Sequence, residues 1–502
     1  MILLNLDKTS KLPLFVQIFQ QLKKLIEENT LEPGFRMPST RTLAEKHGVN
    51  RSTVYKAYEE LWALGYLESR PGSYSIVRKR QKIAAGEPKS PKGLIPWESK
   101  SSEPCQLLHQ AYSQLKYSFP RNLGSSVINL ASLDLDARLF PVDDFRRCIN
   151  TVLIEQGGAL LKYGECEGYR PLREYIAARL RIHGITVNFD EILITNGSQN
   201  GIELILKLLT VPGSSVAVEA PTYSHVLPMM KYFQTNLIDI PMKKDGMDLD
   251  HLRQVLETQK PAFVYTMPNF HNPTGITTDQ AHREKLLSLC ETYRVPILED
   301  AFEEEMKYFG KVPLPIKSMD RQRLVLYLGT FSKILFPGIR IGWIAAEKES
   351  IERLTALKRF SDLSTNTLLQ AALNEFCRQG YYELHVKRMH REYRKRMTAA
   401  ITALREHLSG FAKVSWTEPA GGYLIWLQLR DIRQDEPALQ KLFLEHGAAM
   451  APGQYFYAHY PASHSSEQPH YLHFRISIST LNEKEIKEGI ARLGKALSQV
   501  YR

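Results

Sequence analysis

Long apolar runs and a secretory leader are both missing from this chain of 502 residues. No apolar stretch reaches the length of a membrane-spanning helix. The start, MILLNLDKTSKLP, carries an early acid and lacks the long apolar core of a secretory signal. We therefore expect a cytoplasmic protein with no membrane partner.

Paired cysteines are also missing. The five cysteines are scattered and include no Cys-x-x-Cys pair. This spacing fits a reducing compartment and argues against both a disulfide framework and a metal site. The length itself exceeds that of one ordinary core and predicts two or three domains.

Positive charge is concentrated at the N-terminus. The net charge is +11, and residues 1–85 hold 14 Lys and Arg against 8 Asp and Glu, a balance of +6. Such a concentration is expected of a domain that meets a phosphate backbone. A basic, solvated domain with another role would have the same balance, so charge alone decides nothing.

Three helices are predicted in this basic region. PLFVQIFQQLKKLIEENTLEPG has apolar residues at helical spacing and ends in a Pro-Gly turn. Ser39 and Gly48 are suited to begin and end a second helix, and Asn50 and Gly65 a third. The buried stripe of the third helix is expected to be Val54, Ala57, Leu61 and Leu64. The last two helices form a helix-turn-helix.

The third helix carries the candidate DNA contacts. Its N-terminal turn would enter the major groove, with donors suited to phosphates and base edges. These donors are Arg51, Ser52, Thr53 and Lys56. YLESRPGSYSIV alternates around a Pro-Gly turn and predicts a hairpin wing carrying Arg70. A small helical protein-interaction domain is the alternative interpretation of the pattern.

Residues 12–78 resemble the GntR type of bacterial winged-helix repressors. The run PGFRMPSTRTLAEKHGVNRSTVYKAYEELWALGYLESRPG follows that family nearly end to end. The resemblance implies binding to double-stranded DNA, with contacts from Arg41, Arg51, Thr53 and Gly72. The wing tip, PGSYSIV, departs from the family, which more often has Gly-x-Gly before a Thr-aromatic-Val.

The predicted domains are a winged helix-turn-helix at residues 1–78, a linker at 79–105 and a large domain at 106–502. The linker is rich in Lys, Ser, Pro and Gly without a period, and its prolines favour extended segments. In the large domain, strand-like runs such as EILIT, SVAVEAP, AFVYTMP, VPILED and LVLYLGT alternate with helical stretches. This pattern predicts an α/β fold with a mostly parallel sheet and ligands at the carboxyl ends of the strands.

Polar residues gather at those strand ends. EILIT is followed by NGSQNG, which would aim the amides of Ser198 and Gln199 from a helix N-terminus at a phosphate. Arg340 offers a second, bidentate phosphate ligand. Asp300 ends a buried strand, where a carboxylate is costly unless it is paired, for example with a protonated pyridine nitrogen.

Lys333 follows the strand LVLYLGT. A lysine near a phosphate site can form a Schiff base with an aldehyde if its amine is partly deprotonated, and burial and neighbouring cations favour the neutral amine. In isolation, a solvated surface lysine is the simpler interpretation. The surrounding phosphate and pyridine ligands favour the covalent role.

Residues 127–500 resemble the fold-type I aminotransferases, which use pyridoxal 5′-phosphate. The matching stretches include YGECEGYRPLREYIA, TNGSQNGIELI, PNFHNPTG, EDAFEEE, GTFSKILFPGIRIGW, MAPGQYF and HFRISIS. A GntR-like head joined to such a body resembles the MocR subfamily of bacterial regulators.

The resemblance implies a role for each matching residue. Lys333 would form the Schiff base, Asp300 would hold the pyridinium nitrogen, and Asn272 would donate to the ring oxygen. The ring and phosphate contacts would be Tyr223, Ser198, Gln199, Thr330 and Arg340, with Tyr163 reaching in from the second subunit of a homodimer. Arg475 would bind the carboxylate of an amino-acid effector.

One position departs from the aminotransferase pattern. Phe302 stands where these proteins usually have Tyr, two residues after the aspartate. Its ring cannot donate the usual hydrogen bond to the cofactor's ring oxygen. Cofactor binding should survive, because the other contacts remain, whereas efficient transamination is put in doubt.

These features are compatible with three functions. The first is a transcriptional regulator that senses an amino acid, an amine or a cofactor-related effector through its aminotransferase-like domain. The second is an active aminotransferase with an accessory DNA-binding head, and the third is a DNA-binding protein with a mere dimerisation scaffold. The complete cofactor set argues against the third, and Phe302 with the intact head favours the first over the second. Any transaminase activity would then be weak or vestigial.

Overall fold

The computed structural model describes residues 2–70, 74–79, 95–118, 123–124, 126–310, 313–432, 434–460 and 471–501. The chain divides into two compact units, Met1–Lys100 and Ser101–Arg502. The predicted boundaries at residues 78 and 105 stay a prediction, because residues 80–94 lie outside the described ranges.

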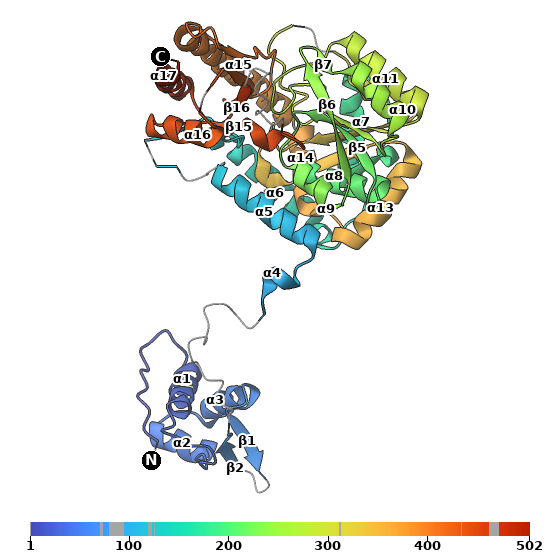
Figure 1. Ribbon diagram of the computed structural model, residues 1–502. Coiled ribbons are helices and arrows are strands. Elements are labelled where there is room, and N and C mark those ends of the chain that lie inside the picture. Colours follow the sequence, from blue (N-terminus) through green and yellow to red (C-terminus); the bar gives the residue numbers. More distant parts are fainter. Residues whose placement is uncertain are drawn as a thin grey trace. The chain divides into compact units, whose positions relative to one another are not determined.

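The first unit is a winged helix-turn-helix (Figure 1). Its elements are α1 (Leu14–Glu27), α2 (Thr40–His47), α3 (Arg51–Ala63), β1 (Leu67–Arg70) and β2 (Tyr74–Val77). The side chain of Ser39 caps α2, that of Asn50 caps α3, and Gly48 ends α2 in the left-handed conformation. β1 and β2 pair antiparallel, so the predicted wing is confirmed.

One expectation for the head is wrong. Val54, Ala57 and Leu61 are buried, but Leu64 is 47% exposed. The cause is that α3 ends at Ala63, so Leu64 no longer follows the helical spacing that would turn it inward. The predicted contact at Gly72 lies outside the described residues, as does the side chain of Arg70.

Within the described residues, the second unit contains an eight-stranded sheet in the order β4-β11-β10-β9-β8-β5-β6-β7. The strands are β4 (Ile192–Thr195), β5 (Ser215–Ala220), β6 (Asn236–Lys243), β7 (Gly246–Met247), β8 (Val264–Thr266), β9 (Ile297–Asp300), β10 (Val325–Thr330) and β11 (Gly342–Ala345). The neighbours from β10 through β6 are parallel, whereas β11 runs antiparallel to both β10 and β4. The mostly parallel sheet predicted from the sequence is therefore confirmed.

Both faces of this sheet are buried, which explains why its strands are continuously apolar. In β5, Val216 and Val218 pack into one core cluster and Ala217 into another. In Figure 1, helices surround the sheet on both faces. They are α6 (Val142–Gln156), α7 (Arg170–Ile182), α8 (Ser198–Leu209), α9 (Val226–Tyr232), α10 (Leu249–Thr258), α11 (Gln280–Tyr293), α12 (Ile316–Met319), α13 (Lys348–Asp362) and α14 (Thr367–Arg378).

A second sheet in the described residues has the order β12-β13-β16-β15, and β3 pairs with β14. The strands are β3 (Ile128–Asn129), β12 (Val414–Trp416), β13 (Leu424–Arg430), β14 (Ala448–Ala449), β15 (Ala451–Pro452) and β16 (Tyr471–Ser477). The remaining helices are α4 (Trp97–Lys100), α5 (Glu103–Ser118), α15 (Tyr381–Leu408), α16 (Glu436–Glu445) and α17 (Glu483–Val500). None of the helices in the described ranges combines the length and apolar character needed to cross a bilayer.

Candidate cofactor and DNA-binding sites

The candidate cofactor residues converge at the carboxyl ends of the central strands. Asp300 ends β9, Thr330 ends β10, and Tyr223 and Asn272 follow β5 and β8. Tyr223 lies within electrostatic reach of Asp300, Arg475 and Arg340, and burial together with the charge of Asp300 raises its pKa to about 12. Segments far apart in the sequence thus meet at one edge of the sheet, as the parallel topology requires.

A cradle for an anion lies at the start of α8. Gly197 has φ +83°, and a Cβ atom there would lie 2.5 Å from Nη2 of Arg340. That nitrogen also donates to the Asn196 carbonyl oxygen at 3.1 Å, which holds the guanidinium beside the backbone. Ser198 begins the helix, and Gln199 follows it. Only glycine permits this approach, so the helix amides and one arginine share a site suited to phosphate.

Asp300 is buried with one oxygen satisfied and one not. Its Oδ2 accepts a hydrogen bond from the Tyr265 hydroxyl at 2.8 Å. Its Oδ1 has no hydrogen-bond partner in the described part of the chain. Burial raises the pKa of this carboxyl to about 7. A buried, orphaned carboxylate oxygen fits a protonated ring nitrogen, which would both pair it and favour its ionised form.

Lys333 lies in the same buried region, in the turn after β10. Its Nζ donates to the Leu133 carbonyl oxygen at 2.9 Å. Burial lowers the pKa of the Lys333 amine, while the negative charge of Glu303 opposes this shift. A depressed amine pKa is what Schiff-base chemistry requires. Nearby, Thr330 Oγ1 accepts from the Ser332 amide, which fixes the turn that carries the lysine.

Arg475 connects two parts of the site. One guanidinium nitrogen donates to Asn272 Oδ1 at 3.0 Å, and another donates to the Ala131 carbonyl oxygen at 2.9 Å. The first bond orients the Asn272 amide so that its NH₂ group remains as a donor, as its predicted role demands. The guanidinium carbon lies 5.0 Å from the centre of the Phe456 ring.

Lys333 and Arg475 therefore bind the same stretch of backbone, which we call the crossing segment (residues 130–136). Its first residue is fixed by backbone hydrogen bonds, from Leu130 to Ala449 and from Ser477 to Leu130, both of 2.8 Å. This segment is not among the site residues predicted from the sequence. Its contacts are made by main-chain carbonyls, which leave no signature in residue type.

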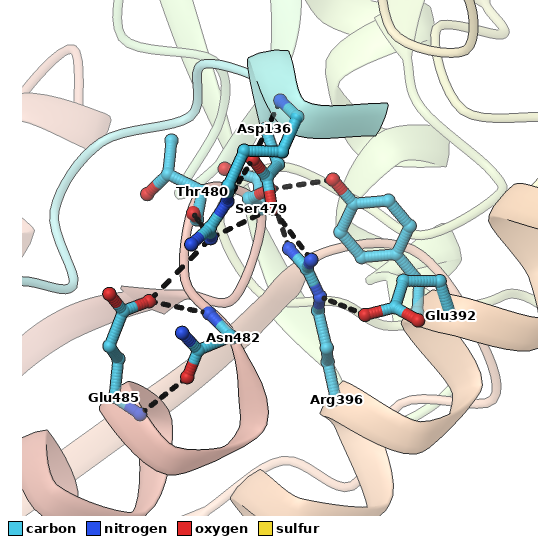
Figure 2. Close-up of polar contacts among 9 residues, drawn as sticks. Asp136, Glu392, Arg396, Ser479, Thr480, Asn482 and Glu485 are labelled. Carbon is cyan, nitrogen blue, oxygen red and sulfur yellow. Dashed lines mark hydrogen bonds and ion pairs between the residues drawn. The ribbon is translucent and has the colours of Figure 1, made fainter. Parts of the chain in front are cut away.

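The far end of the crossing segment is anchored by the buried ionic network of Figure 2. Asp136 accepts from Arg396 at 2.7 Å, and Arg138 binds the same carboxylate. Burial opposes ionisation of Asp136, but the hydrogen bonds from the two arginines outweigh it and lower its pKa. Tyr393 donates to the Ser479 carbonyl oxygen at 2.6 Å in the same network. The segment is thus held at both ends, and Lys333 and Arg475 bind to it between them.

Tyr163 is the predicted cofactor ligand that would come from the second subunit. Its side chain is 83% exposed. Phe302, by contrast, is buried and packs in the apolar cluster beneath the sheet.

In the head, the candidate DNA contacts are solvent-facing. Arg51, Ser52 and Lys56 are exposed, and Thr53 is half-buried. Arg41 forms an ion pair with Glu45 at 2.9 Å, and Lys56 lies over the Phe15 ring at 4.3 Å. These contacts are made by the charged ends of the two side chains at the protein surface, where they are accessible to a phosphate.

Comparison with known proteins supports both units. Residues 14–77 match the family described as bacterial regulatory proteins, gntR family, and residues 125–493 match aminotransferase class I and II. The chain is 30% identical to YdfD of Bacillus subtilis, named as an uncharacterised HTH-type transcriptional regulator, over 98% of both chains. The chain belongs to the MocR subfamily of GntR-type regulators.

Other relatives of this MocR-type chain are enzymes. It is 35% identical to aromatic-amino-acid aminotransferase 1 of Thermococcus litoralis, over 75% of this chain and 89% of that one. The solved structure of LysN, an α-aminoadipate aminotransferase from Thermus thermophilus complexed with N-(5′-phosphopyridoxyl)-L-leucine, matches with a TM-score of 0.70. The identity is 30%, over 81% of this chain and 99% of that one.

The cofactor of this aminotransferase fold is pyridoxal 5′-phosphate, and the site fits it. The orphaned Oδ1 of Asp300, the glycine cradle beside Arg340 and the buried amine of Lys333 match the ring nitrogen, the phosphate and the aldehyde. When bound, the cofactor would supply an electrophilic carbon that exchanges amines.

Proposed function

We propose that this MocR-type protein is a cytoplasmic regulator of transcription whose aminotransferase-like domain senses an amino acid or amine. The observation that carries the proposal is the convergence of Lys333, Asp300 and Arg340 at one site, on a chain whose other unit is a GntR-type DNA-binding head. GntR-type regulators of bacteria bind the chromosome, which lies in the cytoplasm. We therefore propose that this protein acts there.

Each site residue has a proposed task. Lys333 binds the cofactor covalently, Asp300 pairs with its ring nitrogen, and Asn272 donates to its ring oxygen. Tyr223 stacks on the ring, and the phosphate is held by Ser198, Gln199, Thr330 and Arg340. Arg475 binds the effector's carboxylate. The bond from Arg475 to Asn272 supports this assignment, because it aligns the effector ligand with the cofactor ligand.

We propose that the crossing segment reports on occupancy. Lys333 and Arg475 donate to the Leu133 and Ala131 carbonyl oxygens. Covalent attachment of the Lys333 amine to the cofactor would change its bond to Leu133, and a carboxylate bound to Arg475 would compete with Ala131 for the guanidinium N–H groups. Occupied and empty sites then favour different arrangements of the segment, which is the differential interaction that a ligand needs to shift a conformational equilibrium. Along the chain, α5 and β3 lie before the crossing segment, and α5 begins at the end of the predicted linker.

We propose that the protein acts as a homodimer in which Tyr163 of the partner subunit completes the phosphate site. The support is a group of exposed apolar side chains close together in sequence: Ile154 at 85%, Leu161 at 71% and Tyr163 at 83%. Exposed apolar groups of this kind are typical of interaction surfaces. Sedimentation of the purified chain should give a dimer, and a monomer that binds the cofactor at full affinity would contradict the arrangement.

The test of the main proposal uses purified full-length protein loaded with pyridoxal 5′-phosphate. Borohydride reduction followed by peptide mass mapping should place the cofactor on Lys333. Lys333→Ala should lose the adduct, whereas Lys348→Ala, a surface lysine paired with Asp190, should keep it. Amino acids and amines that change the cofactor spectrum should also change affinity for DNA from upstream of the gene. An adduct on another lysine, or spectra and DNA affinity that vary independently, would overturn the proposal.

An active aminotransferase with an accessory head is the second candidate, favoured by the 35% identity to the Thermococcus enzyme. Phe302 opposes it, because this ring cannot take part in proton transfer, which is commonly worth about 10²–10⁴-fold in rate. Keto-acid production in multiple turnovers, at rates on the order of 1–10³ per second, would favour the enzyme.

A further inference from the structure

Glu303 is a buried carboxylate for which the site described so far has no role. It follows β9 and is 0% exposed. Its Oε2 accepts the backbone N–H of Tyr423 at 3.2 Å. Its Oε1 has no hydrogen-bond partner among the residues that the structure describes. Gly422 keeps room for the carboxylate, since a Cβ atom there would lie 2.5 Å from Oε2.

Four ionisable groups face Glu303. The cations are Lys333 and Arg475, and the hydroxyls are those of Tyr308 and Tyr423. The Tyr423 hydroxyl donates to the Lys333 carbonyl oxygen at 2.6 Å, and that of Tyr308 donates to the Gly422 carbonyl oxygen at 2.9 Å. One short stretch of chain thus holds the carboxylate and the lysine turn together, beside the arginine assigned to the effector.

The neighbouring Glu304 provides an internal contrast. Like Glu303, it is buried, burial raises its pKa, its Oε2 is bound, here by the side-chain amide of Asn269, and its Oε1 has no hydrogen-bond partner among the described residues. The difference lies in the charged groups around it, which are His183, Arg283 and Glu305, and Lys333 is not among them. Adjacent buried glutamates therefore face different chemistry.

Effector exchange needs a proton acceptor at this place. An amine reaches the site mainly as an ammonium ion, whose nitrogen has no free electron pair until it loses a proton. Burial raises the pKa of Glu303 to about 8, against which the charge of Lys333 acts. A carboxyl that titrates near the working pH is suited to accept and return a proton. Phe302 has no hydroxyl group and cannot accept or return this proton.

We propose that Glu303 is the proton acceptor for the incoming effector amine. One proton passes from the effector's ammonium to Oε1 of Glu303, and from there to the Lys333 amine as the effector displaces it from the cofactor. One amine replaces another, the proton is conserved, and no further reactant is required. The inference rests on the proposed function, since it needs a cofactor on Lys333.

The test compares full-length, cofactor-loaded wild type, Glu303→Gln and Glu304→Gln, with methylamine as the probe because it lacks a carboxylate for Arg475. The spectral change on mixing is followed by stopped flow from pH 6.5 to 9. In the wild type, the rate should rise toward a plateau above about pH 8 as Glu303 ionises. Glu303→Gln should lose this plateau and slow exchange by about 10²-fold at pH 8, with a remaining rate that keeps rising with the fraction of free methylamine, whereas Glu304→Gln should keep the plateau. Formate should restore part of the rate in Glu303→Ala.

A second readout uses the cofactor-free proteins. A raised carboxyl pKa in the folded state makes stability fall as pH rises from the unfolded value toward about 8, and Glu303→Gln should remove that part of the fall. If Glu303→Gln does not fold, Glu303→Asp is the alternative variant. It should keep this pH dependence with a shifted midpoint, and loss of the pH dependence would overturn the inference.

Equal rates and pH profiles in wild type and Glu303→Gln would also overturn the inference, while cofactor trapped on Lys333 would leave the proposed function standing. Absence of any wild-type adduct would instead refute the proposed function.

Discussion

The two units use the same residue types in opposite environments. In the head, the side chain of Arg41 is 80% exposed and pairs with a glutamate whose side chain is 67% exposed. In the large domain, Arg475 is 5% exposed and is held by a side-chain amide and a main-chain carbonyl. A charge in water can be removed with little effect on folding, whereas a buried charge is part of the fold. Function and stability should therefore separate in the head and be coupled in the large domain.

The largest effect that would sharpen this contrast is expected at Arg396. Replacing it by Ala leaves Asp136 buried with Arg138, a residue whose side chain is 57% exposed, as its remaining guanidinium partner among the described residues. Breaking a buried ion pair typically costs about 3–5 kcal/mol. Urea denaturation should report this loss. Arg405→Ala, on the same helix but in an exposed pair with Glu418, should cost less than about 1 kcal/mol. Equal losses would break the comparison.

A comparable effect is expected at Asp300, and it depends on pH. The folded-state pKa of about 7 lies above the ordinary aspartate pKa of 3.8, so the folded, cofactor-free protein holds a proton that the unfolded chain releases. Stability should fall as pH rises from about 4 to about 7, by on the order of 4 kcal/mol at about 1.4 kcal/mol per pKa unit. Asp300→Asn should remove this part of the fall in thermal unfolding at a series of pH values. Asp250→Asn, at an exposed carboxylate, should follow the wild type.

How far the sequence predicts the molecule also differs between the units. In the head, capping residues and helical spacing predict the elements because the signals are local, and the failure at Leu64 lies at a helix end. In the large domain, apolar runs predict the strands, and the polar residues that follow them predict the site, because parallel strands present their carboxyl ends together.

What the sequence does not predict depends on distant pairs. Asp136 and Arg396 are 260 positions apart, and nothing near either residue names its partner. The contacts of the crossing segment use carbonyl oxygens, which every residue possesses. Glu303 lies among four further acids in the run EDAFEEE, and tertiary contacts such as the hydrogen bond from the Tyr423 backbone N–H distinguish it from Glu304. Such features follow from tertiary packing rather than from residue pattern.

A smaller effect, and one confined to binding, is expected at Arg51. Arg51→Ala should weaken specific DNA binding by roughly 1–3 kcal/mol if the side chain contacts a guanine, and should relax specificity at that base. The melting temperature should not change, because the side chain is exposed. Fluorescence anisotropy with specific and random DNA measures both affinities. Lys24→Ala removes an exposed cation of α1 as the control. Equal weakening on both DNAs would make Arg51 a phosphate contact, and a fall in melting temperature would break the contrast between the units.

The smallest effect is expected at Glu45, which binds Arg41 at 2.9 Å. A phosphate that recruits Arg41 must compete with this carboxylate, and the carboxylate itself repels DNA. An exposed pair one helical turn apart is worth only about 0.3–0.5 kcal/mol, so Glu45→Gln should leave the melting temperature almost unchanged. DNA affinity should rise by about the same free energy, roughly twofold, and the gain should shrink with added salt because screening weakens both the pair and the repulsion.

Anisotropy titrations at two salt concentrations measure this change. Including Arg41→Ala and the double variant completes a double-mutant cycle. If Glu45→Gln lowers affinity, and Arg41→Ala abolishes that change, then Glu45 orients Arg41 for binding. This exposed ion pair of the head would then hold a functional side chain in position, as the buried contacts of the large domain do.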